Sequence, residues 1–407
     1  YEKQGSDCWF TDDPKVFLGD EHNSDDYEKL KDIVEVWFDS GSTHSFVLEK
    51  RKDLKWPADM YLEGSDQHRG WFHSSLLESC GTRGKAPFEN ILSHGFVVDG
   101  KGMKMSKSMG NVISPEDILK NYGADILRVW VAASDYAEDL RIDKSILTQH
   151  AESYRKIRNT FRFMLGNIKD KFEKQNFEKL QLNDFDELEQ YILHKIYNIN
   201  MSVESNLKNY NFHKLYKDLL NFCTLDLSSF YFDIRKDVLY CDDLNSKKRK
   251  NCVIVLNIIL ESLLKWFAPI LVFTTDEIYS LISKEEKNIH EHLFVKIPDN
   301  WENKKLNEKW EQLFKIKQEA NIAIEAKRSS KEIGSSLEAQ IKLTANKTTL
   351  ELLKNLDLAE YFITSKAETS LSENDKIKIE VKIAQGNKCP RCWKILEKIC
   401  VRCSNLI

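Results

Sequence analysis

Lys104-Met105-Ser106-Lys107-Ser108 is the most informative run in this chain. It brings two ammonium groups and two hydroxyls together, with Gly100 and Gly102 before it and Gly110 after it. Flanking glycines let a loop move and let its backbone approach a ligand closely. A compact group of donors suits a polyphosphate. The pattern predicts a mobile nucleotide-binding loop, and a solvated lysine-rich turn is the plain alternative.

Strand and helix signals lie on both sides of this loop. The apolar runs 33–38 and 96–98 each lead into a glycine or a turn, and we expect them to be strands. After the loop, Ser114-Pro115-Glu116-Asp117 has the form of a helix N-terminus, and Gly123 should end that helix after Lys120. Residues 1–143 therefore predict an α/β domain.

Long helical periodicity begins at about residue 144. Apolar residues recur at intervals of three, four and seven in two long segments, and the same texture continues beyond them. The expected helices lie at about 147–168, 188–207, 211–235, 247–267, 270–283 and 307–328. This pattern predicts an all-α bundle over residues 144–330.

The remaining residues predict a small α+β region at 331–385 and a cysteine module at 386–407. A polar stretch at 327–336 indicates a linker, and residues 376–383 alternate strictly between polar and apolar, as a half-buried strand does.

The cysteine module contains two Cys-x-x-Cys pairs, formed by Cys389, Cys392, Cys400 and Cys403. Four paired thiolates suit one tetrahedral structural Zn²⁺, with no open position for catalysis. A redox pair or unrelated thiols is the alternative. Seven residues separate the two pairs, fewer than the roughly 15–20 of the common zinc pattern. The connecting loop is therefore short, which leaves the geometry of the cluster open.

Bulk composition fits this multidomain division. The chain has 407 residues, of which 42% are hydrophobic and 11% aromatic, enough for two to four packed cores. Its net charge of −4 excludes a uniform polycation but leaves room for a local basic face. Five further cysteines are scattered singly, which favours reduced thiols and a cytoplasmic location. No apolar run reaches the roughly 20 residues that span a bilayer.

The residues on either side of the loop add a resemblance to a known family. Ser93-His94-Gly95-Phe96-Val97 precedes the loop and Asn111 to Asp117 follows it. This arrangement resembles the ATP half-site of class I aminoacyl-tRNA synthetases. The resemblance implies a Rossmann-like catalytic fold, ATP used with Mg²⁺, and catalytic roles for Lys104 and Lys107. It also implies that ATP is contacted by Lys107, Ser106, Ser108, His94, Gly95, Phe96 and Val97.

A second stretch of sequence indicates which amino acid an enzyme of this class would activate. Residues 62–72, Leu-Glu-Gly-Ser-Asp-Gln-His-Arg-Gly-Trp-Phe, resemble the form found in the isoleucyl members of this class, and residues 36–42 and 7–10 match the same group. The resemblance implies isoleucyl-adenylate contacts from Glu63, Gly64, Asp66 and Gln67, with Trp37 lining the isoleucine pocket. A core tryptophan, a structural His68 and a valine-specific relative are the alternatives.

Two elements of such an enzyme are missing from this sequence. We find no His-x-Gly-His element and no editing insertion, and the chain starts at Tyr1 without a methionine. Editing is needed because a hydrophobic pocket separates substrates that differ by one methylene by only about 1–3 kcal/mol. We expect both elements upstream, so the chain alone should be inactive. A non-catalytic zinc-containing RNA-binding protein derived from a synthetase is the rival interpretation.

Basic side chains in the helical region suggest an RNA partner. Arg155, Arg158 and Arg162 should share one helix face, and residues 247–250 form a second basic cluster. Ordinary solvated faces are the alternative. Residues 154–160 are similar to the start of the anticodon-binding bundle of the isoleucyl, valyl and leucyl enzymes, and Trp393 matches the zinc module of bacterial isoleucyl enzymes. The resemblance implies tRNA(Ile) and L-isoleucine as partners and a monomeric full-length protein.

Overall fold

The computed structural model describes residues 3–32, 35–168, 172–284, 287–374, 376–398 and 400–404. The chain divides into two compact units. The first comprises Tyr1–Val97 and Tyr136–Leu140, and the second comprises Val98–Asp135 and Arg141–Ile407. The division runs through the short strands β3 (Val97–Asp99) and β4 (Leu140–Ile142).

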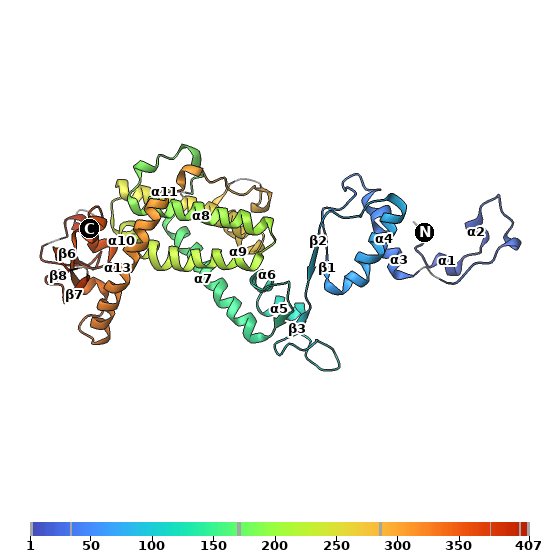
Figure 1. Ribbon diagram of the computed structural model, residues 1–407, viewed down its shortest axis with the longest axis horizontal. Coiled ribbons are helices and arrows are strands. Elements are labelled where there is room, and N and C mark those ends of the chain that lie inside the picture. Colours follow the sequence, from blue (N-terminus) through green and yellow to red (C-terminus); the bar gives the residue numbers. More distant parts are fainter. Residues whose placement is uncertain are drawn as a thin grey trace. The chain divides into compact units, whose positions relative to one another are not determined.

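The first unit is built on a strand–helix–strand arrangement (Figure 1). Strands β1 (Tyr61–Gly64) and β2 (Ile91–His94) pair in parallel, and α4 (Trp71–Arg83) connects them. Parallel neighbours require such a crossover, and this is the local motif of α/β domains. The short helices α1 (Cys8–Thr11) and α2 (Lys15–Leu18) precede this arrangement.

Aromatic side chains pack β1 against α4. The rings of Tyr61 and Trp71 stack with centroids 4.1 Å apart and planes 8° from parallel. The Tyr61 hydroxyl lies 3.0 Å from Ser75 Oγ, so the polar end of this buried ring has a partner. Stacked aromatic pairs contribute roughly 0.5–1.5 kcal/mol beyond the area that they bury.

The strand predicted over residues 33–38 is wrong where the structure describes it. Residues 33–34 lie outside the described residues, and the next positions form helix α3 (Val36–Gly41). Glu35 caps this helix, because its carboxylate accepts the Trp37 N–H at 2.7 Å. Gly41 then allows close contact with α4, since a Cβ there would lie 2.4 Å from Glu78 Oε1.

The second unit is mainly helical, as the periodicity predicts. Its long helices are α5 (Pro115–Asn121), α6 (Ala124–Ala133), α7 (Lys144–Ile168), α8 (Glu187–Lys208), α9 (Phe212–Asn221), α10 (Phe232–Cys241), α11 (Lys247–Phe267), α12 (Val272–Ile282) and α13 (Lys304–Ser329). The expected helix at 211–235 continues through a π-helical stretch, Phe222–Tyr231, and ends at Cys241. The expected N-terminus at Ser114 is confirmed, because Ser114 Oγ accepts the Glu116 N–H at 3.2 Å.

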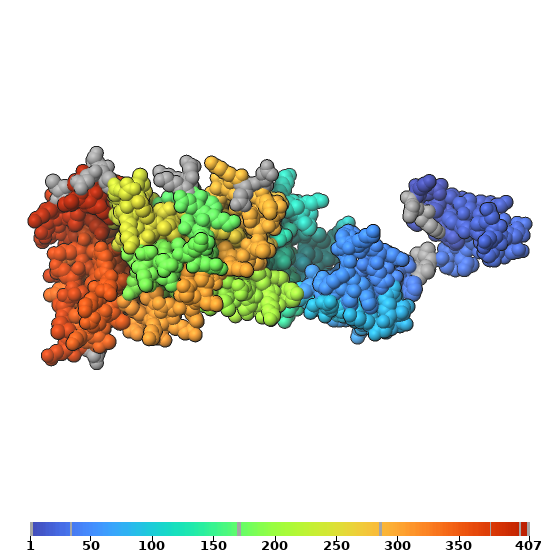
Figure 2. All heavy atoms as spheres, turned by 90° about the horizontal axis from the view of Figure 1, so that it is seen from above, coloured from blue at the N-terminus to red at the C-terminus, as the bar shows by residue number. Residues whose placement is uncertain are grey.

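One hydrophobic core runs through the bundle. Helices α7 and α8 both pack along α11. In the space-filling view of Figure 2, the segments coloured from green to orange form one closely packed mass. Phe161, Ile192, Leu260, Trp266 and Trp310 are each at most 1% exposed. Full burial of one large apolar side chain contributes roughly 1.5–3 kcal/mol, so this core is the main source of stability in the second unit.

The helices that follow the lysine-rich loop are fastened to this bundle. On α6, the Asp125 carboxylate accepts bonds from the N–H of Thr274 at 2.8 Å and from its hydroxyl at 2.6 Å. Arg128 donates to the carbonyl of Pro269 at 2.6 Å and to that of Ile270 at 3.1 Å. The chain leaving the loop is therefore held by charge-assisted bonds, of which those between Asp125 and Thr274 are buried.

A small sheet follows α13. Its strand order is β6 (Lys366–Leu371), β5 (Ala339–Ala345) and β7 (Lys378–Ile383), with β5 parallel to β6 and antiparallel to β7. Helices α14 (Lys347–Leu353) and α15 (Leu358–Tyr361) lie between β5 and β6 in sequence. The predicted strand at 376–383 is thus confirmed from Lys378 onward, whereas the central strand β5 is absent from the sequence-based prediction.

The last elements frame the cysteines: β8 (Asn387–Lys388), β9 (Ile395–Leu396) and α16 (Val401–Ser404). Within the part of the chain that the structure describes, no helix combines the length and the apolar character needed to cross a membrane.

Candidate functional site

Several predicted site residues stand at the carboxyl ends of the parallel strands in the first unit. Glu63 lies opposite Ser93 and Gly64 lies opposite His94. Parallel strands of α/β domains bind ligands at this edge. Gly64 permits close packing there, because a Cβ would lie 2.7 Å from Asp66 Oδ1 and 3.8 Å from His94 Cε1. The fold therefore brings Glu63, Gly64, Asp66 and His94 to one edge.

Trp37 and Gln67 meet at the start of α4. A Cβ on Gly70 would lie 2.9 Å from Trp37 Cη2 and 2.6 Å from Gln67 Oε1, so only glycine fits between the two side chains. Gln67 Oε1 accepts the Trp71 N–H at 2.9 Å, and Trp71 Nε1 donates to the Ser40 carbonyl at 2.9 Å. Trp37 is 42% exposed, so its ring lines a surface and is not a core residue.

The His94–Val97 segment is tightly held by residues 136–140. The Gly95 N–H donates to the Tyr136 carbonyl at 2.9 Å, and the Phe96 N–H donates to Asp139 Oδ1 at 2.8 Å. A Cβ on Gly95 would lie 2.3 Å from the Glu138 carbonyl oxygen, which explains the glycine. Both N–H groups of the Gly-Phe pair are thus already used. This bonding fixes the segment and leaves the Phe96 side chain half exposed.

The lysine-rich loop belongs to the second unit, and two polar residues hold its base. The Asp99 carboxylate accepts the N–H groups of Lys101 at 2.9 Å and Met103 at 2.8 Å, and the Asn111 side-chain amide at 2.9 Å. Asn111 Oδ1 in turn accepts the Ser106 N–H at 2.9 Å. The hydrogen bond from Asn111 and those from the backbone lower the pKa of Asp99, so this carboxylate stays ionised.

Within the loop, the lysines are free and the serines are partly engaged. Lys104 and Lys107 are exposed, and neither forms an ion pair with any residue that the structure describes. The hydroxyls of Ser106 and Ser108 lie 3.2 Å apart. Two unpaired ammonium groups on a clamped frame can bind and neutralise phosphate oxygens without first breaking an ion pair.

Sequence reasoning did not find Asp99 or Asn111. The sequence signal for Asp99 is weak, because an Asp-Gly pair at 99–100 indicates only a turn. Gly102 and Gly110 have φ of +82° and +65°. The glycines therefore serve the left-handed backbone of the turn ends, which is a more specific role than general mobility.

The four cysteines of the last module come together. Sulfur atoms of Cys389, Cys392, Cys400 and Cys403 all lie within 4.8 Å of one another. Cys392 Sγ and Cys400 Sγ are 3.8 Å apart, which matches the roughly 3.8 Å expected for two sulfurs on a tetrahedral ion with bonds of about 2.3 Å. The short connecting loop is thus long enough, and these residues fit a metal ion.

Local backbone geometry presents these thiols. The Cys389 N–H donates to the Lys394 carbonyl at 2.9 Å and the Trp393 N–H donates to the Cys389 carbonyl at 3.0 Å, forming a tight knuckle. Burial alone would raise the pKa of the Cys389 thiol, but the backbone N–H groups of Cys392 and Arg391 lower that pKa to about 7. A thiol of this kind is readily deprotonated for metal binding.

The cysteine module is anchored to the end of α10. The Arg402 guanidinium forms bonds of 2.7 and 2.9 Å to Asp237 and of 3.1 Å to Asp242. Arg391 donates to the Tyr240 carbonyl at 3.2 Å, and the buried Cys241 packs against the cluster. The module is therefore an integral part of the second unit.

The two predicted basic clusters differ in whether their side chains have partners within the protein. Arg155, Arg158 and Arg162 are all exposed on α7, opposite the buried Ile157 and Phe161. In the 247–250 cluster, by contrast, Lys248 pairs with the buried Glu360, and Arg249 donates to the Asp242 carbonyl at 2.7 Å. The arginine face is exposed, with Arg155 in a surface ion pair with Glu152 at 3.1 Å, whereas two members of the second cluster have internal structural partners.

Two family models match this chain. Residues 1–143 match the model described as tRNA synthetases class I (I, L, M and V). Residues 189–343 match the anticodon-binding domain of tRNA ligase.

Similar proteins cover the whole chain. It is 65% identical over 405 residues to the isoleucine–tRNA ligase of Pelagibacter ubique and 42% identical over 418 residues to that of Zymomonas mobilis. Each alignment takes in 100% of this chain but only 45% and 44% of the two relatives. The chain thus spans about half the length of the curated relatives that it matches.

A solved ternary complex, Agrobacterium radiobacter K84 agnB2 LeuRS with tRNA and LeuAMS, aligns with a TM-score of 0.48 and 13% identity. That alignment covers 79% of this chain and 38% of the LeuRS chain.

Proposed function

Because this chain joins a class I tRNA synthetase domain to the anticodon-binding domain of a tRNA ligase, and so belongs to the class I tRNA synthetases, we propose that it is part of an isoleucine–tRNA ligase. The observation that carries the proposal is the identity of 65% to one such ligase over 405 residues, including both halves of the candidate site. The rival interpretations, a non-catalytic RNA-binding protein and a valine enzyme, have no comparable support.

The proposed reaction has two steps. A carboxylate oxygen of isoleucine attacks the α-phosphorus of ATP, the bond to the β-phosphate oxygen breaks, and pyrophosphate leaves. A hydroxyl of the terminal tRNA ribose then attacks the isoleucyl carbonyl carbon, and AMP leaves. Negative charge grows on the departing pyrophosphate during the first step, so cations placed there stabilise the transition state more than the ground state.

We assign that electrostatic task to Lys107 and Lys104. Both ammonium groups are exposed, and Asp99 and Asn111 hold the backbone that carries them. The Ser106 and Ser108 hydroxyls are proposed to donate to phosphate oxygens after exchanging their mutual contact. Mg²⁺ would accompany ATP and share the neutralisation of its phosphates.

The first unit is proposed to hold the amino acid and the base. Glu63 and Asp66 supply acceptors for the ammonium and ribose groups of isoleucyl-adenylate, Gln67 and Gly64 shape that edge, and Trp37 walls the aliphatic side chain. His94, Gly95, Phe96 and Val97 would border adenine. Since both N–H groups of Gly95 and Phe96 are already bonded, we expect contact through the Phe96 ring and the segment around Val97.

We divide the proposed protein into four regions. They are a partial Rossmann-like catalytic domain at 1–143, an anticodon-binding domain at 144–330, a connecting α+β region at 331–385 and the cysteine module at 386–407. Zn²⁺ is the proposed ion of that module, held by Cys389, Cys392, Cys400 and Cys403 in a structural role. We further propose tRNA(Ile) as the RNA partner, a monomer, and action in the cytoplasm, where translation takes place.

Pyrophosphate exchange by the full-length protein tests this assignment. Isoleucine should support exchange of labelled pyrophosphate into ATP at a kcat/KM at least about tenfold above that for valine, because one methylene is worth about 1–3 kcal/mol in a fitted pocket. A preference for valine, or no exchange with either amino acid, would contradict the proposal.

A further inference from the structure

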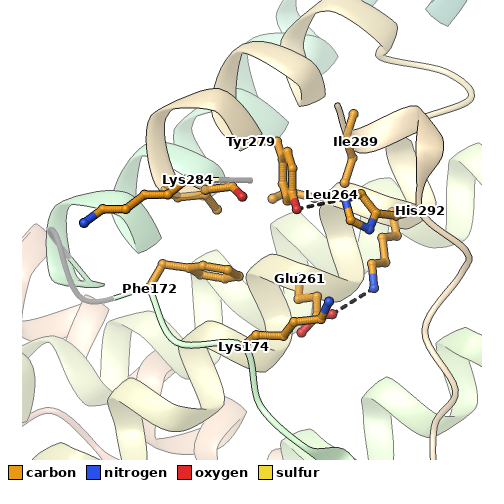
Figure 3. Close-up of a pocket in the computed structure, with 11 residues that line it drawn as sticks. Phe172, Lys174, Glu261, Leu264, Tyr279, Lys284, Ile289 and His292 are labelled. Carbon is orange, nitrogen blue, oxygen red and sulfur yellow. Dashed lines mark hydrogen bonds and ion pairs between the residues drawn. The ribbon is translucent and has the colours of Figure 1, made fainter. Parts of the chain in front are cut away.

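The described residues that line a cavity of about 510 Å³ in the helical bundle include none of the candidate site. Polar side chains in its wall are paired with one another, as the dashed lines in Figure 3 mark. Lys265 donates to Glu261 at 2.8 Å, and the Tyr279 hydroxyl lies 2.9 Å from His292 Nε2. These pairs belong to the packing of the bundle, and we assign the cavity no part in the reaction. The first unit, by contrast, contains a glycine whose neighbours affect which amino acid fits the proposed pocket.

Gly70 lies directly before α4, and the edge of the Trp37 ring fills the space where a side chain would begin. A Cβ on Gly70 would lie 2.9 Å from Trp37 Cη2 and 3.1 Å from Trp37 Cζ3, whereas ordinary contacts of a Cβ begin at about 3.4 Å. The same Cβ would lie 2.6 Å from Gln67 Oε1. The position of the Trp37 ring therefore depends on the absence of a side chain at Gly70.

The backbone of Trp37 is held in place, so a new side chain at position 70 would act on its ring. Glu35 accepts the Trp37 N–H at 2.7 Å at the start of α3. Helix α3 is joined to α4, because Trp71 Nε1 donates to the Ser40 carbonyl at 2.9 Å. The ring can turn about its own side-chain bonds more easily than these two helices can separate.

A ring that turns away from Gly70 changes the shape of the proposed pocket. Trp37 is 42% exposed, and its ring is the proposed wall against the isoleucine side chain. The distance from Cη2 to the new carbon would have to increase from 2.9 Å to at least 3.4 Å, so the outer edge of the ring would move by about half an ångström. Closely packed sites respond to changes of the size of one methylene. The pocket would thus become narrower.

We propose that Gly70 sets the specificity of the amino-acid pocket. The missing side chain keeps the Trp37 ring withdrawn and leaves room for isoleucine, whose side chain has one methylene more than that of valine. A hydrophobic pocket separates two such amino acids by about 10- to 200-fold, so a small change in its width is enough to alter the choice. Gly70 acts through Trp37 and is a positioning residue. This role rests on the proposed function, which makes Trp37 a wall of the pocket.

Pyrophosphate exchange by the full-length protein without tRNA tests this role, with kcat/KM measured for isoleucine and for valine. In Gly70→Ala the ratio of kcat/KM for isoleucine to that for valine should fall at least about tenfold, because the displaced ring excludes the extra methylene. The contact with Gln67 should lower kcat/KM for both amino acids alike. The matched control is Gly81→Ala on the same helix, where a Cβ meets no atom within 4 Å and the ratio should equal that of the wild type.

A double variant shows whether the effect passes through Trp37. Phenylalanine lacks the two ring carbons that a Cβ on Gly70 would meet. In a Trp37→Phe background, Gly70→Ala should therefore change the ratio by less than about twofold. If Gly70→Ala does not fold alone, the double variant should fold, because the clash with the ring is gone, and its ratio should match that of Trp37→Phe.

Three results would overturn the role of Gly70. They are an unchanged ratio in Gly70→Ala, an equal fall of the ratio in the Trp37→Phe background, and a double variant that fails to fold. Each leaves the isoleucine assignment intact when the wild type prefers isoleucine. A wild type without that preference would instead contradict the proposed function itself.

Discussion

At the scale of single residues, the surroundings of a side chain decide what that side chain does. The pair Asp99 and Asn111 is one example, and Lys317 is another. Asp99 and Asn111 hold the backbone that carries Lys104 and Lys107, because Asn111 donates to Asp99 at 2.9 Å and accepts the Ser106 N–H at 2.9 Å. Lys317 differs from the exposed Lys104 and Lys107, because its side chain is buried. It is 8% exposed on α13, donates to the Tyr361 carbonyl and lies 4.8 Å from the centroid of the Tyr361 ring. Burial lowers the pKa of Lys317 to about 8.

The depressed pKa of Lys317 predicts a pH-dependent contribution to stability. Below about pH 8 the folded protein buries a charged ammonium, and this cost is present in full. Between there and about pH 10.4 the unfolded chain still binds the proton while the folded chain does not, so stability rises with pH. The free energy of unfolding of the wild type, minus that of Lys317→Met, should increase by about 2 kcal/mol between pH 7 and pH 9.5. Urea unfolding at both pH values measures it, and a flat or falling difference would contradict the assignment.

At the scale of elements, polar contacts between distant segments join the helices, the small sheet and the cysteine module. Arg235 on α10 forms bonds of 2.6 Å to Glu189 on α8 and 2.7 Å to Glu360 on α15. Lys248 on α11 completes this ion cluster through Glu360. Arg402 fastens the cysteine module to the same helix α10. One helix therefore connects the bundle, the connecting region and the module.

Removal of Arg235 tests the ion cluster. Its side chain is 4% exposed, and those of Glu189 and Glu360 are 1% and 9% exposed. Arg235→Ala would leave the buried Glu189 carboxylate without the cation that pairs with it and would leave Glu360 with Lys248, so the free energy of unfolding should fall by roughly 3–5 kcal/mol. The control Arg328→Ala breaks the exposed pair with Glu325 and should cost less than about 0.5 kcal/mol. Equal, small losses in both variants would show that the cluster contributes little.

The cysteine module predicts a specific metal content. The chain should bind one Zn²⁺, and Co²⁺ in its place should give the absorption of a tetrahedral all-sulfur site. Cys400→Ser should lose the ion and loosen the contacts of Arg402, which would appear as faster proteolysis near residue 390. Cys80→Ser, at an exposed cysteine of the first unit, should keep one ion per chain. Full metal content in Cys400→Ser would contradict the assignment.

Local patterns were predictable from the sequence, and contacts between distant residues were not. The 104–108 loop, the Ser114 cap and the four cysteines were visible because each depends on neighbours within a few positions. The Arg235 cluster was not, because its partners lie 46 and 125 residues away. Residues 36–38 were misassigned because an apolar run alone does not separate strand from helix, and the Glu35 cap decided the outcome. Strand β5 was missed although Ala339, Ile341, Leu343 and Ala345 alternate inward.

At the scale of the whole molecule, the two units carry different parts of the proposed site. The first unit presents the strand edge with Glu63 and His94, and the second carries the loop together with the bundle and the cysteine module. Because α6 is bonded to the start of α12, the loop and the helical bundle belong to one body. Contacts between RNA and the bundle would therefore act on the same unit that carries the proposed phosphate-binding loop.

The exposed arginine face of α7 predicts how RNA binding depends on salt. Replacement of Arg155, Arg158 and Arg162 by alanine in the full-length protein should weaken tRNA(Ile) binding at every salt concentration. If each side chain contacts one phosphate, the slope of log K against log salt should fall by about two to three. The control, alanine at the exposed Lys315, Lys331 and Lys354, should leave the slope unchanged. Identical slopes in both triple variants would mean that this face is only solvated.

The most direct measurement is isoleucine-dependent pyrophosphate exchange by the full-length protein carrying Lys107→Ala. We expect a fall in kcat of about 10²–10³, because an ammonium group that stabilises the leaving phosphates would be lost. Lys101→Ala, an exposed lysine in the same turn but outside the five-residue run, should retain wild-type exchange. Undiminished exchange in Lys107→Ala would contradict the proposal that this loop binds the departing pyrophosphate.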